Sequence, residues 1–90
     1  PTQDEQTVLL ELRGRRLYIK DVEMALDLRG AQIEDVARHL LALVEKQLVI
    51  KHHIRGKAYL YYQTLYGAAL SDFITHWADG SESSTATQTR

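Results

Sequence analysis

The residues between 32 and 46 carry the strongest pattern in the chain, and they limit what the rest can form. Apolar side chains recur there at spacings of three and four, which places them on one face of a helix. These side chains are Ile33, Val36, Ala37, Leu40, Leu43 and Val44. We therefore predict a helix over residues 32–46, led in by a turn at Gly30.

Two runs rich in β-branched and aromatic residues follow, at residues 48–54 and 58–62. The loop between them, Arg55-Gly56-Lys57, is short and contains a glycine, so the two runs predict a β-hairpin. We expect the tyrosines of this hairpin to pack the small sheet onto the helices.

Shorter elements are expected before this segment. Asp4 is a good N-cap for a first helix, and Gly14 suits the left-handed position that ends one. Residues 17–19 are β-prone and long enough for one edge strand. A second, short helix opens at Lys20 and breaks at Gly30.

A last helix is predicted over residues 65–78. Residues 80–90 hold no apolar side chain larger than alanine, which predicts a disordered tail. The chain is then one domain over residues 1–79. Its expected class is α+β, mostly α with a small β-hairpin, in the order α-β-α-α-β-β-α.

Composition excludes several classes of protein. A chain of 90 residues that is 44% hydrophobic and 26% charged is typical of one small soluble domain. It has no cysteine, which removes disulfides, thiol nucleophiles and thiolate metal sites. No apolar run approaches the roughly 20 residues of a membrane helix, and no signal-peptide pattern is present. We therefore expect a cytoplasmic protein.

Catalysis and metal binding are not expected. No spacing suggests a nucleophile with its base, and no glycine loop could cradle a phosphate, so we predict neither an enzyme nor a cofactor. His52 and His53 are adjacent in a predicted strand, which points their side chains to opposite faces. Because no carboxylate falls at a ligand spacing either, no metal site is predicted.

The stretch over residues 19–62 resembles a winged helix-turn-helix, and in particular the transcriptional regulators of the MarR and ArsR types. The likeness lies in AQIEDVARHLLALVEKQLVI followed by HIRGKAYLYY, and the whole stretch covers about half of the chain. It implies double-stranded DNA as the partner. The helix over 32–46 would lie in the major groove, and a wing over 51–58 would lie on the backbone.

Charge placement bears on that interpretation. Between Arg13 and Lys57 there are ten Lys and Arg residues against six Asp and Glu. The candidate DNA-contacting residues are Gln32, Asp35, Arg38, His39, Lys51, His53, Arg55, Lys57, Arg15 and Arg16. Of these, Arg55 and Lys57 are expected on the backbone or in the minor groove, whereas helix residues such as Arg38 would face base edges. A solvated hairpin tip, and a surface pairing of Arg38 with Glu34 or Asp35, are the alternatives.

The last predicted helix carries a large apolar stripe, formed by Tyr66, Leu70, Phe73, Ile74 and Trp77. Terminal helices often form the dimer interface in the families that the chain resembles, so a homodimer is expected. Burial of the same stripe against the first helix is the alternative.

The expected function is sequence-specific binding of double-stranded DNA by a dimeric transcriptional regulator. Two alternatives stay open. A winged helix can serve as a protein-interaction module, which suits the near-neutral net charge of −1 and the acids Glu34 and Asp35. The same DNA contact can also serve a replication or plasmid-maintenance protein.

Overall fold

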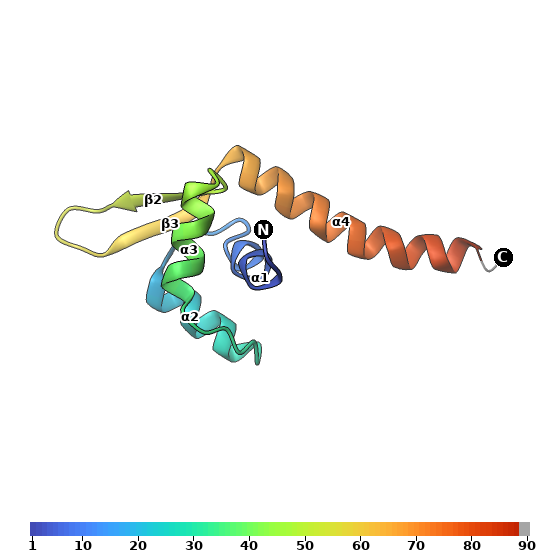
Figure 1. Cartoon of the computed structure of the whole chain (residues 1–90), viewed down its shortest axis with the longest axis horizontal. Coiled ribbons are helices and arrows are strands. Elements are labelled where there is room, and N and C mark those ends of the chain that lie inside the picture. Colours follow the sequence, from blue (N-terminus) through green and yellow to red (C-terminus); the bar gives the residue numbers. More distant parts are fainter. Residues whose placement is uncertain (89–90) are drawn as a thin grey trace.

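A computed structural model describes the backbone of residues 1–88 and the side chains of residues 1–77. Within that part the chain forms four helices and one three-stranded antiparallel sheet (Figure 1). In chain order the elements are α1 (Gln3–Glu11), β1 (Leu17–Tyr18), α2 (Ile19–Leu28), α3 (Val36–Glu45), β2 (Val49–His53), β3 (Tyr59–Gln63) and α4 (Leu65–Gln88). The α+β class and the order of elements are those predicted from the sequence.

The core lies where helices α1, α2 and α3 meet the base of the sheet. It consists of Val8, Leu9, Leu12, Val22, Leu26, Val36, Leu40, Leu43, Val49 and Tyr61. Three of these, Val8, Leu9 and Leu12, come from α1 and its C-terminal cap and are completely buried. Since full burial of one such side chain stabilises a fold by about 1.5–3 kcal/mol, α1 is a central support of the domain.

Strand β3 lies in the middle of the sheet, in the order β1-β3-β2. In the β2–β3 pair, Val49 lies opposite Gln63 and His53 lies opposite Tyr59. At the base of the hairpin Val49 and Tyr61 are buried, but the rest of β2 is exposed. Beyond the pairing of β3 with β1 at Leu60 and Tyr61, the two strands leave the body of the protein as a two-stranded ribbon, seen at the left of Figure 1.

Helix α3 begins at Val36, so the predicted start at residue 32 was four residues early. Asp35 takes the N-cap position in a left-handed conformation, with φ 57° and ψ 51°, which a short polar side chain tolerates better than most. Ile33 fits the helical pattern because it packs against the core, yet it does so from the preceding loop. The C-terminal boundary of α3 is within one residue of the prediction.

Helix α4 follows β3 after a single residue, Thr64. The Thr64 hydroxyl caps the helix: it accepts a hydrogen bond from the Gly67 amide at 2.9 Å and donates to the Gln47 carbonyl at 2.7 Å. The side-chain amide of Gln63, the residue before Thr64, donates a hydrogen bond to the Leu9 carbonyl at 2.9 Å. These bonds fix the direction in which α4 leaves the sheet.

The backbone of α4 continues to Gln88, past the predicted end at residue 78 and through most of the predicted tail over 80–90. Gly80 suggests a helix end in the sequence, but a glycine inside a helix costs only about 1 kcal/mol relative to alanine, and no proline follows it. The side chains of this segment lie outside the described residues. Among the helices the structure does describe, none combines the length and apolarity needed to cross a membrane.

Candidate nucleic-acid interface

Positive charge is concentrated on the β2–β3 hairpin. No Asp or Glu occurs anywhere between Lys46 and Ser71. The hairpin within that stretch carries Lys51, Arg55 and Lys57, all exposed. It also carries two exposed histidines, His52 and His53. A chain with a net charge of −1 therefore has one surface that is strongly basic.

The inner face of the hairpin, defined as the side that carries the buried Tyr61, has a cation beside an aromatic ring. The Lys51 ammonium lies 4.3 Å from the centre of the Tyr59 ring. His53 lies on the same face, with its ring centre 5.1 Å from that of Tyr59. This arrangement places Lys51 and His53 side by side, and cation–π attraction favours it.

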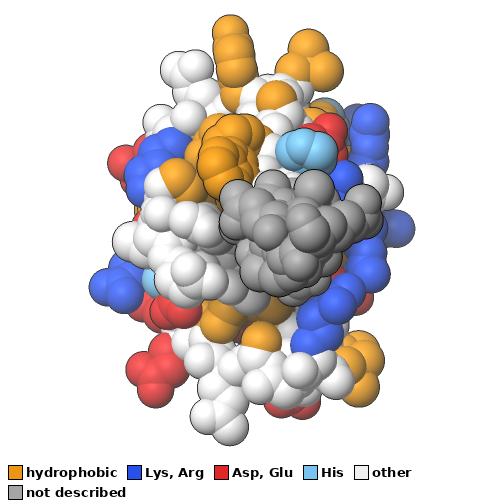
Figure 2. Space-filling model, turned by 90° about the vertical axis from the view of Figure 1, so that its right-hand side faces the viewer, with side chains coloured by type: hydrophobic (Ala, Val, Ile, Leu, Met, Phe, Trp, Pro, Cys, Tyr) orange, Lys and Arg blue, Asp and Glu red, His pale blue; other side chains and the backbone are white. Residues whose placement is uncertain are grey.

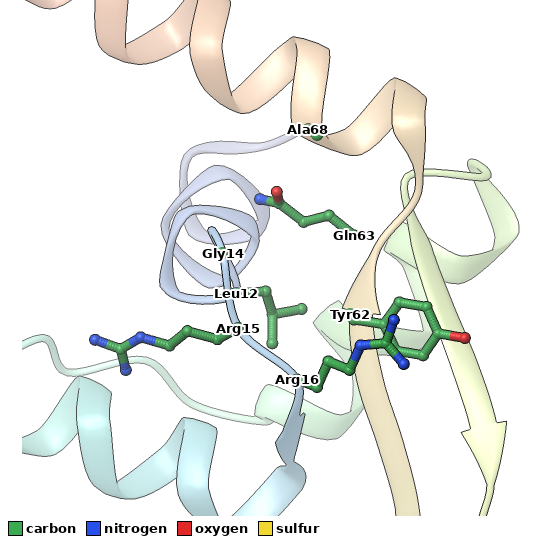
Figure 3. A pocket seen from close by; sticks show the side chains of 7 residues that line it. All are labelled: Leu12, Gly14, Arg15, Arg16, Tyr62, Gln63 and Ala68. Carbon is green, nitrogen blue, oxygen red and sulfur yellow. The ribbon is translucent and has the colours of Figure 1, made fainter.

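The outer face has a matching arrangement. The Arg16 guanidinium, from the loop between α1 and β1, lies 4.4 Å from the centre of the Tyr62 ring. His52 lies 6.4 Å from the same ring. Figure 3 shows the Arg16 side chain over Tyr62, while Arg15 points away from it. The hairpin therefore has basic side chains on both faces.

Arg55 and Lys57 lie at the tip of the hairpin, on either side of Gly56. The turn is closed by a hydrogen bond from the Lys57 amide to the Ile54 carbonyl at 2.9 Å, and Gly56 has a φ of +75° that suits glycine. Over the described side chains, neither Arg16 nor any of the three hairpin cations forms an ion pair. Their charges are therefore available to an anionic partner.

Arg15, also predicted as a DNA contact, forms an ion pair with another residue of the chain. Its guanidinium lies 3.2 Å from Oε2 of Glu11, whose side chain is almost fully buried. Arg29 reaches the other oxygen of Glu11 at 2.6 Å. Glu11 thus holds two arginines, and among the side chains that the structure describes the cation of this loop without an ion pair is Arg16 rather than Arg15.

The residues predicted to read bases do not form one surface. Gln32 lies in the loop before α3, where it lines a pocket of about 300 Å³ together with Glu23, Asp27 and Asp35. Arg38 is exposed but lies 3.4 Å from the Asp35 carboxylate. His39, also predicted as a DNA contact, has a side chain that is only 12% exposed and lies 3.8 Å from the Asp4 carboxylate, so it points towards α1 rather than outward.

The exposed side of α3 is otherwise apolar or acidic. It presents Ala37, Leu41 and Glu45 beside Arg38. Residues 20–45 as a whole hold three Lys and Arg residues against six Asp and Glu. The chain therefore has a basic hairpin and an acidic α2–α3 surface, and Asp21 at the start of α2 lines a pocket together with Lys57 of the hairpin.

Lys46 belongs to the fold rather than to the interface. Its ammonium lies 2.5 Å from Oε1 of the buried Glu5, which also accepts a hydrogen bond from the Thr2 amide at 3.3 Å. The hydrogen bond from Lys46 holds the pKa of the Glu5 carboxyl below its usual range, against the opposing effect of burial. The contact joins the start of α1 to the end of α3, and no sequence pattern indicated it.

The apolar stripe predicted on α4 divides into two parts. Tyr66, Phe73 and Trp77 are exposed by 73%, 57% and 58%, and the last two rings meet edge to face at 5.9 Å. Leu70 and Ile74 are half-buried, and Leu70 packs against the core. Figure 2 shows hydrophobic side chains gathered beside the grey end of the helix. The three aromatic residues therefore form the exposed part of the stripe.

Among the side chains that the structure describes, no group of three or more histidines and carboxylates could hold a metal ion. Comparisons of the chain with protein-family models, curated proteins and solved structures found no match.

Proposed function

We propose that the chain is a winged-helix protein that binds double-stranded DNA, with the β2–β3 hairpin as its wing. The element order, with a sheet order of β1-β3-β2 and a protruding hairpin, supports this fold. The observation that carries the proposal is that the hairpin bears no acid and three exposed cations, none of which forms an ion pair with the side chains of residues 1–77. Such a surface suits a phosphate backbone.

The net charge of −1 does not oppose this function. Exposed charges interact over about 8–10 Å at physiological ionic strength, so acids beyond that distance have little effect at the hairpin tip. Asp21 at the start of α2, which lines a pocket together with Lys57, is the acid that lies beside the hairpin. Contacts from Arg16, Lys51, Arg55 and Lys57 would release about four counterions. A plot of log affinity against log salt would then have a slope of roughly −3 to −4.

The proposed role is regulation of transcription by a homodimer. Exposed aromatic residues on α4 support self-association, because large aromatic side chains dominate the energetics of interfaces. Two copies would bind two half-sites of an operator, and occupancy of the operator would block or recruit polymerase.

The first test is fluorescence anisotropy with a labelled mixed-sequence duplex at low and at near-physiological salt. Arg55→Ala combined with Lys57→Ala should weaken binding about tenfold or more and reduce the salt slope by about one for each of the two side chains that contacts phosphate. The matched control combines Arg13→Ala with Arg38→Ala, which removes the same charge from two exposed ion pairs outside the hairpin. Equal weakening by both double variants would show that net charge, and not the hairpin, governs binding.

A second candidate function is protein docking through the α2–α3 surface. Met24, Leu28 and Leu41 are exposed there by 62%, 82% and 48%, and large apolar side chains that lie together on a surface are typical of docking sites. No binding of duplex at low salt would favour this function over the first.

A further inference from the structure

We propose that the hairpin itself, and not helix α3, enters the major groove of the duplex, and that Arg55 at its tip contacts guanine there. This inference rests on the proposed function, since it concerns how the same surface meets DNA. It differs from the sequence-based expectation, in which the helix over residues 32–46 lies in the groove.

Helix α3 is poorly suited to a groove. Its exposed side offers one base-reading side chain, Arg38, which faces Asp35. Glu34 and Asp35 lie exposed just before its first turn, and the neighbouring pocket is lined by Glu23 and Asp27. Inserting this end of the helix would bring four carboxylates towards two rows of phosphates, and like charges repel.

The hairpin has the charge distribution that a groove requires. A ribbon inserted between two DNA strands meets phosphates on both of its sides. Lys51 lies on the inner face beside Tyr59, and Arg16 lies on the outer face over Tyr62. One basic side chain can therefore reach each wall of the groove. Arg55 and Lys57 lie at the tip, which is the part of the hairpin that would enter the groove first.

The dimensions also fit. The major groove is about 12 Å wide and 8.5 Å deep and admits a two-stranded ribbon, whereas the minor groove is only about 6 Å wide. The five residues from Lys51 to Arg55 span about 13 Å in an extended strand, which is more than the depth of the groove. When Arg55 reaches the floor of the major groove, Lys51 therefore lies just beyond the rim, and its long side chain can reach back to the phosphates.

Arg55 is the side chain that would add sequence preference. An arginine at the floor of the major groove can donate two hydrogen bonds to O6 and N7 of guanine, the commonest base-specific contact. Lys57, with a single ammonium, would contact one acceptor or a phosphate. We therefore expect a preference for guanine that depends on Arg55.

The experiment compares three duplexes of the same mixed sequence in the anisotropy assay. One contains guanine. The second contains 7-deazaguanine, which lacks the N7 acceptor in the major groove. The third contains inosine, which lacks the amino group in the minor groove. The wild-type chain should bind the 7-deazaguanine duplex roughly fivefold to a hundredfold more weakly than the guanine duplex and the inosine duplex about as well as it.

Variants then assign the contact to an element. Arg55→Ala should remove the difference between guanine and 7-deazaguanine, whereas the matched control Arg38→Ala should retain it. Lys51→Ala and Arg16→Ala should each weaken all three duplexes alike, because they contact phosphate. Thermal unfolding followed by circular dichroism checks that each variant is folded.

Three results would overturn the inference. Equal affinity for guanine and 7-deazaguanine would exclude contact with guanine N7. Loss of the difference in Arg38→Ala, with its retention in Arg55→Ala, would assign the groove to α3 and leave the proposed function intact. No binding of any duplex by the folded wild-type chain would overturn both the inference and the proposed function.

Discussion

Gly67 is the residue at which the position of α4 is most tightly constrained. A Cβ atom added to it would lie 1.9 Å from the Leu48 carbonyl oxygen. The same oxygen accepts a hydrogen bond from the Thr64 amide at 3.1 Å, so neither partner can move away freely. Only glycine lets the helix lie this close to the turn between α3 and β2.

We therefore expect Gly67→Ala to lower the free energy of unfolding by about 1–3 kcal/mol or more, the usual cost of overpacking a well-filled interior. Urea unfolding followed by circular dichroism measures this change. Ala69→Ser is the matched control, because it also adds one heavy atom to α4, but at an exposed position. Its effect should stay within about 0.5 kcal/mol. Similar losses in both variants would contradict a specific contact at Gly67.

The Glu5–Lys46 pair makes stability depend on pH. In the folded chain the hydrogen bond from Lys46 lowers the pKa of Glu5, so its contribution is complete above the unfolded pKa of about 4.3. It is lost as the pH falls through the lower, folded value. Glu5→Gln should therefore be clearly less stable than the wild type at pH 7, and the difference should shrink steadily below about pH 4.

Urea unfolding of both proteins at pH 7, 4 and 3 measures that difference. Glu45→Gln, at an exposed position near the same end of α3, is the control and should change little at any of these pH values. A difference between Glu5→Gln and the wild type that stays constant from pH 7 to pH 3 would contradict the assignment.

The spacing of apolar residues predicted which helices and strands are present, but not always the residue at which each one begins. The apolar spacing of α3 and the two β-rich runs gave the correct order of elements, because both patterns arise from burial of one face. The same reasoning misplaced the start of α3. Ile33 is partly buried from a loop, and burial alone does not distinguish a loop residue from a helical one.

The interface was predictable only in part. The exposure of Arg55 and Lys57 followed from a glycine-containing turn. The pairing of Lys51 with Tyr59 depends on strand register, and that of Arg16 with Tyr62 on the path of a distant loop. Strand alternation was the one available signal that Lys51 and His53 share a face. The inward position of His39 depends on where α1 packs, which no local pattern contains.

Helix α4 is the element for which we expect self-association. Phe73→Ser should weaken the dimer at least about tenfold, since central aromatic side chains commonly account for about 2 kcal/mol or more of an interface. Size-exclusion chromatography with light scattering over a range of concentrations measures the change. Leu28→Ser, at an exposed apolar position on α2, is the control and should leave the dimer unchanged. A wild-type chain that stays monomeric at high concentration would contradict the dimer.

The separation of the basic hairpin from the acidic α2–α3 surface can be tested by removing acidic side chains instead of basic ones. Glu34→Gln combined with Asp35→Asn raises the net charge by two, and asparagine tolerates the left-handed conformation of position 35. If the hairpin makes the main contact, duplex affinity should rise by less than about threefold at physiological salt, because these acids lie outside the contact. A rise of tenfold or more in the anisotropy assay would mean that the start of α3 lies against phosphates.

The single-residue link at Thr64 has a consequence for DNA sites of different lengths. Strand β3 and helix α4 form one nearly continuous stretch of chain, and the hairpin and α4 leave the body on opposite sides (Figure 1). In a pair of copies joined along α4, sliding one helix past the other by seven residues moves it by about 10 Å. That displacement equals about three base pairs of DNA. The register of the helix pair would thus set how far apart two half-sites must lie for both hairpins to reach them.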